Sequence, residues 1–283
     1  MCELLGDRRE APPRAPRETP LLPLGARETH LWTLSLPGAG PEPPSQVLAE
    51  LDRRERDRAA AFLRSRDRIR YVAAHVALRR VLALYLGLTP GAVRFGRAAC
   101  RRCSGPHGRP EVRDAVGAPH FSLSHSGDLA TVAVARVPVG VDVQTVPSPG
   151  ATDLNVQRLH PCERNEVAEL PPAERPRAFA RVWSRKEAYL KGLGVGLSRR
   201  LDADYLGGHG DSADGEWLVR DLPGEALGGA EVRDAVAALA VRTRQDHRVT
   251  LRTVPGRAIR APGPMAATEP HHAVDLNTAE RPA

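Results

Sequence analysis

The sequence predicts an α+β fold made of two halves of similar plan, and two observations support this class. Apolar residues recur at helical spacing in two long segments, one in each half of the chain. Short runs rich in valine and alanine, which are typical of strands, follow each helical segment. The order helix, strands, helix, strands therefore indicates two α+β halves, at residues 29–146 and 147–254, although no internal sequence repeat marks them.

The first helical segment covers residues 46–87, and the glycine at its end, Gly87, is a typical helix terminator. Its length predicts two or three helices. The second segment covers about residues 173–191, where Trp183 lies on an apolar stripe and Gly192 is the expected C-cap.

The strands are expected after each helical segment. Phe121–Ser124 alternates in polarity, and the runs Leu129–Arg136 and Val139–Gln144 are joined by a Val-Pro turn, which predicts a β-hairpin between these two runs. Residues 232–243 and 249–254 are the strands expected in the second half.

The two ends of the chain differ in composition from its centre. Residues 1–28 are rich in Pro, Arg and Glu without periodicity, and residues 255–283 are similarly irregular, so we expect a mobile tail at each end. No run of 18 or more apolar residues occurs, and the N-terminal residues lack the apolar core of a signal peptide. We therefore expect a cytoplasmic protein without a membrane role.

The net charge is +7, from 41 Lys and Arg against 34 Asp and Glu. This surplus suits a partner that carries phosphates or acids, whether nucleic acid, a phosphorylated cofactor or an acidic protein. The arginines between Arg58 and Arg80 suggest nucleic acid, but aromatic residues make up only 4% of the chain, and Asp57 and Asp67 interrupt the run. We expect most of these arginines to form a solvated helix face, with one or two reaching a ligand.

Asp142 is the first candidate for chemistry. Strand alternation places Asp142 and Gln144 on one face of their run and the valines on the other. An acid in a valine-rich strand is costly to bury without a partner. It is therefore either a solvent-facing carboxylate at a strand end or a hard oxygen ligand for Mg²⁺.

The only two lysines of the chain, Lys186 and Lys191, lie in the nine-residue stretch WSRKEAYLK. An ammonium group can act as an acid, whereas a guanidinium keeps its proton in proteins. Glu187 follows Trp183 by one helical turn, which places it beside the buried stripe as a second candidate ligand or base. The alternative is coincidence, with a surface ion pair between Glu187 and Lys191 at the favourable i, i+4 spacing.

Two further segments offer groups that bind phosphate. Ser124 and His125 end an alternating strand before a glycine turn, where backbone amides and a histidine could hold phosphate oxygens. Arg109 follows a glycine and precedes a proline, so it either presents a guanidinium from a tight turn or is an ordinary solvated arginine. Cys100 and Cys103 form a C-x-x-C pair, but the chain has no second matching pair, which disfavours zinc.

The ordered set RDRIRY, GRP, FSLSHSGD, GVDVQ and WSRKEAYLK resembles the Sfp-type 4′-phosphopantetheinyl transferase family over roughly residues 50–200. The resemblance implies a pseudo-dimer of two α+β halves that binds coenzyme A and Mg²⁺, with Mn²⁺ as an alternative, in the cleft between them. It further implies transfer of 4′-phosphopantetheine to a serine of an apo acyl or peptidyl carrier protein, with release of adenosine 3′,5′-bisphosphate. We expect a monomer that does not act on nucleic acid; which carrier protein is served stays open.

The resemblance also implies roles for individual residues. Asp142, Gln144 and Glu187 are at the positions of metal ligands. Glu187 is in addition the expected proton acceptor, and Lys191 is the lysine beside the pyrophosphate. Further residues in or near the family motifs are expected to contact the cofactor: Arg58, Arg70, Arg109, Ser124, His125 and Lys186. For Lys186 a surface role is the alternative. Glu163 is at a further acidic position of the pocket.

One departure from the family pattern concerns the metal. Gln144 occupies a position where family members commonly have Glu, so a neutral amide replaces a third anionic ligand. A weakened, coenzyme A-binding relative and a nucleic-acid or acidic-protein binding module are the rival interpretations.

Overall fold

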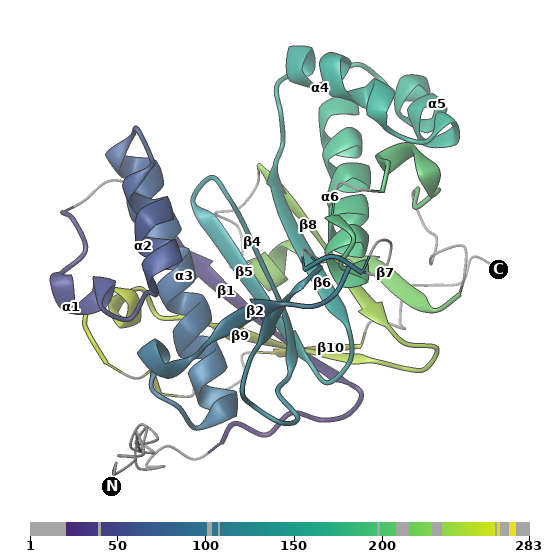
Figure 1. Cartoon of the computed structure of the whole chain (residues 1–283). Coiled ribbons are helices and arrows are strands. Elements are labelled where there is room, and N and C mark those ends of the chain that lie inside the picture. Colours follow the sequence, from purple (N-terminus) through teal and green to yellow (C-terminus); the bar gives the residue numbers. More distant parts are fainter. Residues whose placement is uncertain are drawn as a thin grey trace, which may run out of the picture.

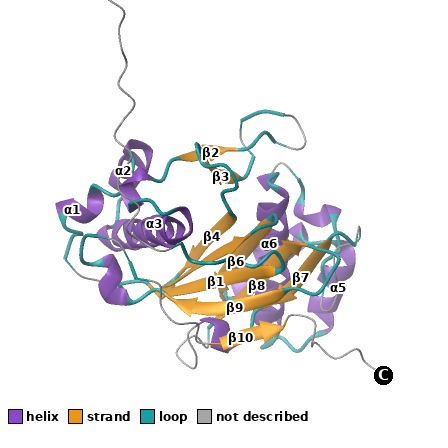
Figure 2. Ribbon diagram, turned by 90° about the horizontal axis from the view of Figure 1, so that it is seen from below, coloured by secondary structure: helices purple, strands orange, loops and turns teal. Residues whose placement is uncertain are grey.

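In the computed structural model of the chain, the strands form the centre, with one group of helices on each side (Figure 1). Helices α1–α3 lie on one side and α4–α6 on the other, an arrangement that is also clear in the perpendicular view of Figure 2. The structure describes residues 21–38, 41–100, 104–106, 108–196, 199–207, 215–227, 234–263, 265–266 and 272–275.

The first helical segment contains three helices, as its length predicted. They are α1 (Ser45–Leu48), α2 (Arg53–Ala60) and α3 (Ser65–Leu86). Gly87 ends α3 in the left-handed conformation at φ 63°, which a residue without a Cβ adopts at little cost.

A five-stranded sheet has the order β10-β9-β1-β5-β4, and a separate hairpin pairs β2 with β3. The expected hairpin between the runs at 129–136 and 139–144 is wrong, because β5 pairs with β4 and β1, whereas the 139–144 run pairs in another sheet. The bounds are β1 (Glu28–Ser35), β2 (Phe95–Arg97), β3 (Pro110–Val112), β4 (His120–Ser126), β5 (Leu129–Ala135), β9 (Arg248–Thr253) and β10 (His272–Asp275).

A three-stranded sheet has the order β6-β8-β7, and helix α6 packs against it. Gly194, not Gly192, ends α6 in the left-handed conformation at φ 75°. The bounds are β6 (Val139–Thr145), β7 (Trp217–Asp221), β8 (Ala235–Arg242), α4 (Pro149–Asn155), α5 (Pro161–Glu169) and α6 (Arg175–Leu193).

The two halves of the chain exchange strands. β6 comes before residue 147 but pairs with β8, while β9 from the second half pairs in parallel with β1. β10 lies within the segment expected as a mobile C-terminal tail, and Ile259 and Met265 of that segment are buried in the core, so this part of the expectation is corrected. Of the expected N-terminal tail, residues 1–20 lie outside the described residues.

Serine side chains join the two sheets. In β4 the serines alternate, so all three point toward β6. The Oγ atoms of Ser122, Ser124 and Ser126 accept hydrogen bonds from the backbone amides of Val141, Val143 and Thr145 at 3.1, 3.2 and 3.0 Å, respectively. The alternation in FSLSHS therefore links the halves at the strand that carries Asp142.

Glycines let α6 approach β6 closely. A Cβ at Gly140 would lie 1.9 Å from the carbonyl oxygen of Ala188, and a Cβ at Gly192 would lie 2.4 Å from the ring of Trp217. Both distances are far below van der Waals contact, so only glycine fits at either position. The close approach brings the side chains at the end of α6 next to those of β6.

Candidate functional site

Two adjacent cavities lie between α3 on one side and α6 on the other. The larger has a volume of about 1150 Å³ and the smaller of about 410 Å³. His75, Leu123 and Lys191 line both cavities, so these three residues mark their junction. A ligand with two distinct parts could therefore extend from one cavity into the other.

Asp142 and Lys191 form the centre of the small cavity. The Nζ of Lys191 donates to Oδ1 of Asp142 at 2.7 Å, to Oγ of Ser124 at 3.0 Å and to the carbonyl of Val141 at 3.2 Å. Ser124 also donates to Oδ1 of Asp142 at 2.8 Å. Asp142 is only 5% exposed, and its other oxygen, Oδ2, is buried and accepts no hydrogen bond from any described residue. A buried carboxylate oxygen without a donor is costly unless a ligand supplies the missing partner.

Glu187 lies one helical turn before Lys191 on α6 and lines the same small cavity. Burial raises the pKa of Glu187, and the negative charge of nearby Asp142 raises it further, although Lys191 partly offsets both effects. Two carboxylates that disfavour each other's charge are stabilised by a cation between them. Gln144, from the same face of β6 as Asp142, also lines the cavity.

His125 borders the small cavity at the end of β4. His125 is exposed, yet partial desolvation lowers its pKa, and the positive charges of His75 and Lys191 lower it further. The clustering of cationic groups around His125 suits an anionic ligand.

The large cavity is basic and partly aromatic. Arg109, which the resemblance puts among the cofactor contacts, lines it together with Arg97 and Arg113. Its wall also includes the rings of Phe95 and Phe121. Guanidinium groups bind phosphate through several hydrogen bonds, and aromatic rings provide a surface for a planar base.

Arg53 and Arg54 also line the large cavity, and sequence reasoning missed them. They begin α2, and the signal that could have found them is the pattern D-x-x-E. Asp52 accepts from the backbone amide of Glu55 at 2.9 Å, and Glu55 accepts from that of Asp52 at 2.8 Å, which is a capping box. This cap places both arginines at a helix start, at the edge of the cavity.

Lys186 does not reach either cavity. Its ammonium is 2.8 Å from a carboxylate oxygen of Glu163, and the side chains are 2% and 0% exposed. Lys186 also donates to the carbonyl of Asp204. The assignment of Lys186 to cofactor binding and of Glu163 to the pocket is therefore corrected: five residues along α6 turn Lys186 away from the face that carries Lys191.

Arg70 and Arg58 are also placed elsewhere. Arg70 pairs with Asp128 in the turn between β4 and β5. The Arg58 guanidinium lies 5.4 Å from the ring centroid of Phe62. Neither side chain lines the two cavities, so these positions do not support the expectation that they hold cofactor phosphates.

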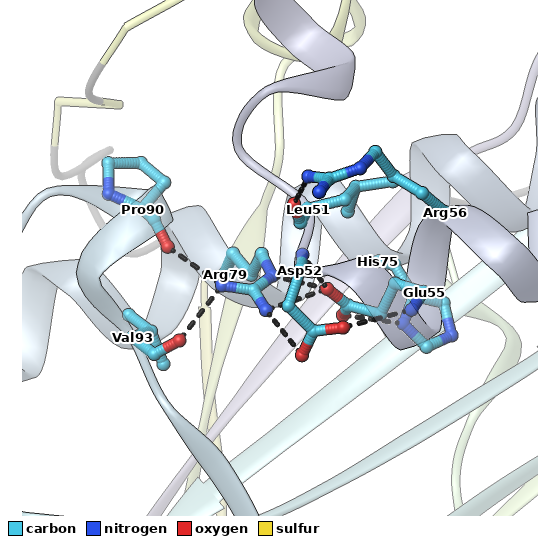
Figure 3. A network of polar contacts seen from close by, with 8 residues as sticks. All are labelled: Leu51, Asp52, Glu55, Arg56, His75, Arg79, Pro90 and Val93. Carbon is cyan, nitrogen blue, oxygen red and sulfur yellow. Dashed lines mark hydrogen bonds and ion pairs between the residues drawn. The ribbon is translucent and has the colours of Figure 1, made fainter.

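Arg79 and Arg80 are buried, which contradicts the expectation that they belong to a solvated helix face. Both are 1% exposed, and Arg80 pairs with Glu50. Arg79 pairs with Asp52 and Glu55 and donates to the carbonyls of Pro90 and Val93 (Figure 3). The same network includes His75, which contacts Glu55 (Figure 3). Arg79 therefore holds α2 against α3, and Arg80 holds the segment before α2.

The described residues contain no cluster of three or more His, Cys, Asp and Glu side chains that could hold a metal. Cys103, the second cysteine of the C-x-x-C pair, lies outside the described residues. The carboxylates of Asp142 and Glu187 are thus a two-carboxylate set, which suits Mg²⁺ when substrate phosphates complete its coordination.

Comparison with known proteins identifies the family. A family model described as the 4′-phosphopantetheinyl transferase superfamily matches residues 138–239, the segment that carries Asp142, Glu187 and Lys191. The 4′-phosphopantetheinyl transferase HetI of Nostoc sp. is 33% identical over 187 residues, which cover 64% of this chain and 74% of that protein. The chain belongs to the 4′-phosphopantetheinyl transferase family.

Other 4′-phosphopantetheinyl transferases are similar at lower identity. One from Bacillus subtilis is 28% identical over 158 residues, which cover 56% of this chain and 66% of that protein. The L-aminoadipate-semialdehyde dehydrogenase-phosphopantetheinyl transferase of Homo sapiens is 26% identical over 166 residues, which cover 53% of this chain and 51% of that protein.

The resemblance and the α+β class predicted from the sequence are thereby confirmed. As a 4′-phosphopantetheinyl transferase, the protein transfers the phosphopantetheinyl group to carrier proteins, with coenzyme A as the substrate that supplies it. Within the described part of the chain, none of the helices combines the length and hydropathy needed to cross a bilayer.

Proposed function

We propose that this transferase is Mg²⁺-dependent and that Asp142, Gln144 and Glu187 hold the cation in the small cavity. The observation that carries the proposal is Oδ2 of Asp142, which is buried without a hydrogen bond from any described residue. Lys191 engages Oδ1, so Oδ2 is the oxygen left for a cation. The donor set of two carboxylates and an amide oxygen suits Mg²⁺, with Mn²⁺ as an alternative. When bound, the cation would offset the negative charge of the pyrophosphate.

The proposed position of coenzyme A follows from the chemistry of the two cavities. The large cavity, with its guanidinium groups and aromatic rings, would take the adenosine part and its 3′-phosphate. The pyrophosphate would then lie at the junction, next to Lys191 and His125. Arg109 supports this placement, because its position in the large cavity matches the role implied by the sequence.

In the proposed reaction, the serine hydroxyl of an apo carrier protein attacks the β-phosphorus of coenzyme A. A phosphodiester bond forms to the serine oxygen, and the bond from the β-phosphorus to the bridging oxygen breaks, which releases adenosine 3′,5′-bisphosphate. Glu187, whose carboxylate lines the small cavity, accepts the serine proton directly or through water. Lys191, which lines both cavities, stabilises or protonates the leaving phosphate.

The carrier protein is the second substrate. Carrier domains present an acidic helix, and the net charge of +7 would steer such a partner toward the enzyme at low salt. A panel of apo carriers from fatty-acid, polyketide and peptide assembly is the direct way to find the partner.

The test measures the mass gain of apo carrier proteins incubated with coenzyme A and enzyme, with and without Mg²⁺. We expect transfer only with a divalent cation, and loss of transfer in D142A although the variant remains folded. The matched control is D153A, which removes an exposed carboxylate of α4 and should keep full transfer. Gln144→Glu should lower the Mg²⁺ concentration needed for half-maximal rate, because it restores an anionic ligand.

Two results would contradict the proposal. Full transfer by D142A, or by the wild-type enzyme in a chelator, would remove Asp142 and the cation from the mechanism. Binding of coenzyme A without transfer to any carrier of the panel would instead favour a weakened relative that only binds the cofactor.

A further inference from the structure

His75 lies at the junction of the two cavities, and the proposed mechanism gives it no role. It is on α3, in the first half of the chain, opposite the face of α6 that carries Lys191. It is one of the three residues that line both cavities. A side chain at this point would contact any ligand that passes from one cavity to the other.

The ring of His75 is held in one orientation. Its Nδ1 is 3.1 Å from Oε1 of Glu55, and its ring centroid is 4.1 Å from that of Tyr71, with the planes 30° apart. Glu55 is itself fixed, because it also accepts from Nε of Arg79 at 2.7 Å (Figure 3). With Nδ1 engaged by Glu55, the other ring nitrogen, Nε2, has no hydrogen-bond partner among the described residues.

The environment of Glu55 decides which proton His75 carries. Burial acts to raise the pKa of Glu55, but the hydrogen bonds from His75 and Arg79 outweigh burial and leave the pKa below its ordinary value. Glu55 is therefore a carboxylate that accepts a hydrogen bond from Nδ1–H of His75. In a doubly protonated imidazole both nitrogens are donors, so Nε2 can donate to an anion while Nδ1 donates to Glu55.

The neighbours of His75 across the junction are cationic as well. Lys191 lines both cavities, and the charge of His75 contributes to the lowered pKa of His125. His75 of α3, His125 of β4 and Lys191 of α6 thus all line the small cavity. An anion placed among these groups would be stabilised by them, and the part of coenzyme A proposed for this place is its pyrophosphate.

We propose that His75 is a further phosphate-binding residue, which donates from Nε2 to the pyrophosphate of coenzyme A where the cofactor passes between the cavities. The inference rests on the proposed position of coenzyme A. Glu55 and Tyr71 are positioning residues: they orient the imidazole so that the first half of the chain contributes to the pyrophosphate site opposite Lys191.

The experiment measures the Kd of coenzyme A and of 3′-dephospho-coenzyme A by titration calorimetry, with Mg²⁺ and without carrier protein. In His75→Asn we expect about a tenfold higher Kd, about 1.4 kcal/mol, for both ligands, because one charge-assisted hydrogen bond to the shared pyrophosphate is lost. His75→Lys, which returns a cationic donor, should recover most of the affinity. The matched control is His160→Asn, a histidine at the start of α5 that lines neither cavity and should leave both constants unchanged.

The outcomes separate this inference from the proposed function. If the wild-type enzyme does not bind coenzyme A, the proposed function fails; if wild type binds and folded His75→Asn binds equally well, only the inference fails. A loss for coenzyme A but not for 3′-dephospho-coenzyme A would place His75 at the 3′-phosphate and overturn the assignment to the pyrophosphate. Thermal melting checks that each variant is folded. If His75→Asn does not fold, His75→Gln is measured in its place.

Discussion

Replacing Lys186 by Met tests whether this lysine serves the fold or the cofactor. Lys186 and Glu163 are 2.8 Å apart, and their side chains are 2% and 0% exposed. The Met side chain fills the space of the lysine stem but removes the ammonium. Glu163 is then left as a buried carboxylate that still accepts from the backbone amides of Leu206, at 2.7 Å, and His160, at 3.0 Å.

The magnitude follows from the burial of the pair. Removing one partner of a buried ion pair costs about 3–5 kcal/mol, since the remaining charge has lost its counter-ion. The two retained amide hydrogen bonds to Glu163 argue for the lower end, about 3 kcal/mol. At about 2–4 °C per kcal/mol for a chain of this size class, the melting temperature should fall by roughly 6–12 °C.

Urea unfolding and calorimetric titration with coenzyme A provide the assay. Folded K186M should bind coenzyme A with the wild-type Kd. The double variant K186M/E163Q should recover at least about 1 kcal/mol relative to K186M, because a neutral amide is less costly to bury than an unpaired carboxylate, and it still accepts hydrogen bonds. Unchanged stability together with a raised Kd would refute the reasoning and return Lys186 to the cofactor site.

Two further predictions concern Lys191 and His120. K191R should keep coenzyme A binding yet slow transfer, because a guanidinium does not release a proton; full activity in steady-state kinetics would exclude the acid role. Burial, and secondarily Arg109, lower the pKa of His120 from 6.5 to about 4, so the unfolded state binds the extra proton first. The contribution of His120 to the free energy of unfolding is therefore fully present above pH 6.5 and is lost as the pH falls toward 4. The loss between pH 7 and pH 5 should be up to about 2 kcal/mol. Urea unfolding at pH 7 and pH 5 measures the free energy of unfolding of wild type and of H120N. The decrease between the two pH values should be smaller in H120N by about the contribution of His120. An equal decrease in both proteins would contradict the lowered pKa of His120.

Several elements and one part of the candidate site could be predicted from local patterns. Helical periodicity and Gly87 define the end of α3, and the valine runs indicate β5, β6 and β8. The family motifs point to Asp142, Glu187 and Lys191, and the structure brings these three side chains to one cavity. Such predictions succeed because side-chain period and capping are properties of a single segment.

Strand partners could not be predicted in the same way. β5 and β6 are adjacent in sequence and joined by a short turn, yet β6 pairs with β8, about 100 residues later. Pairing depends on hydrogen bonds and packing between distant segments, and no local pattern encodes which distant strand is chosen. The strand exchange between the halves, and the return of β10 to the first sheet, have the same cause.

By itself the sequence determined the types of the main elements, the family, and the residues that the motifs mark for chemistry. The tertiary structure decided which charged residues are accessible to a ligand: it buries Lys186 against Glu163 and Arg79 against Glu55, and it places His75, Arg53 and Arg54 at the cavities. The reason is physical. The type of an element depends on residues that are close in sequence, whereas the role of a charge depends on its desolvation and on partners that only the folded chain brings near.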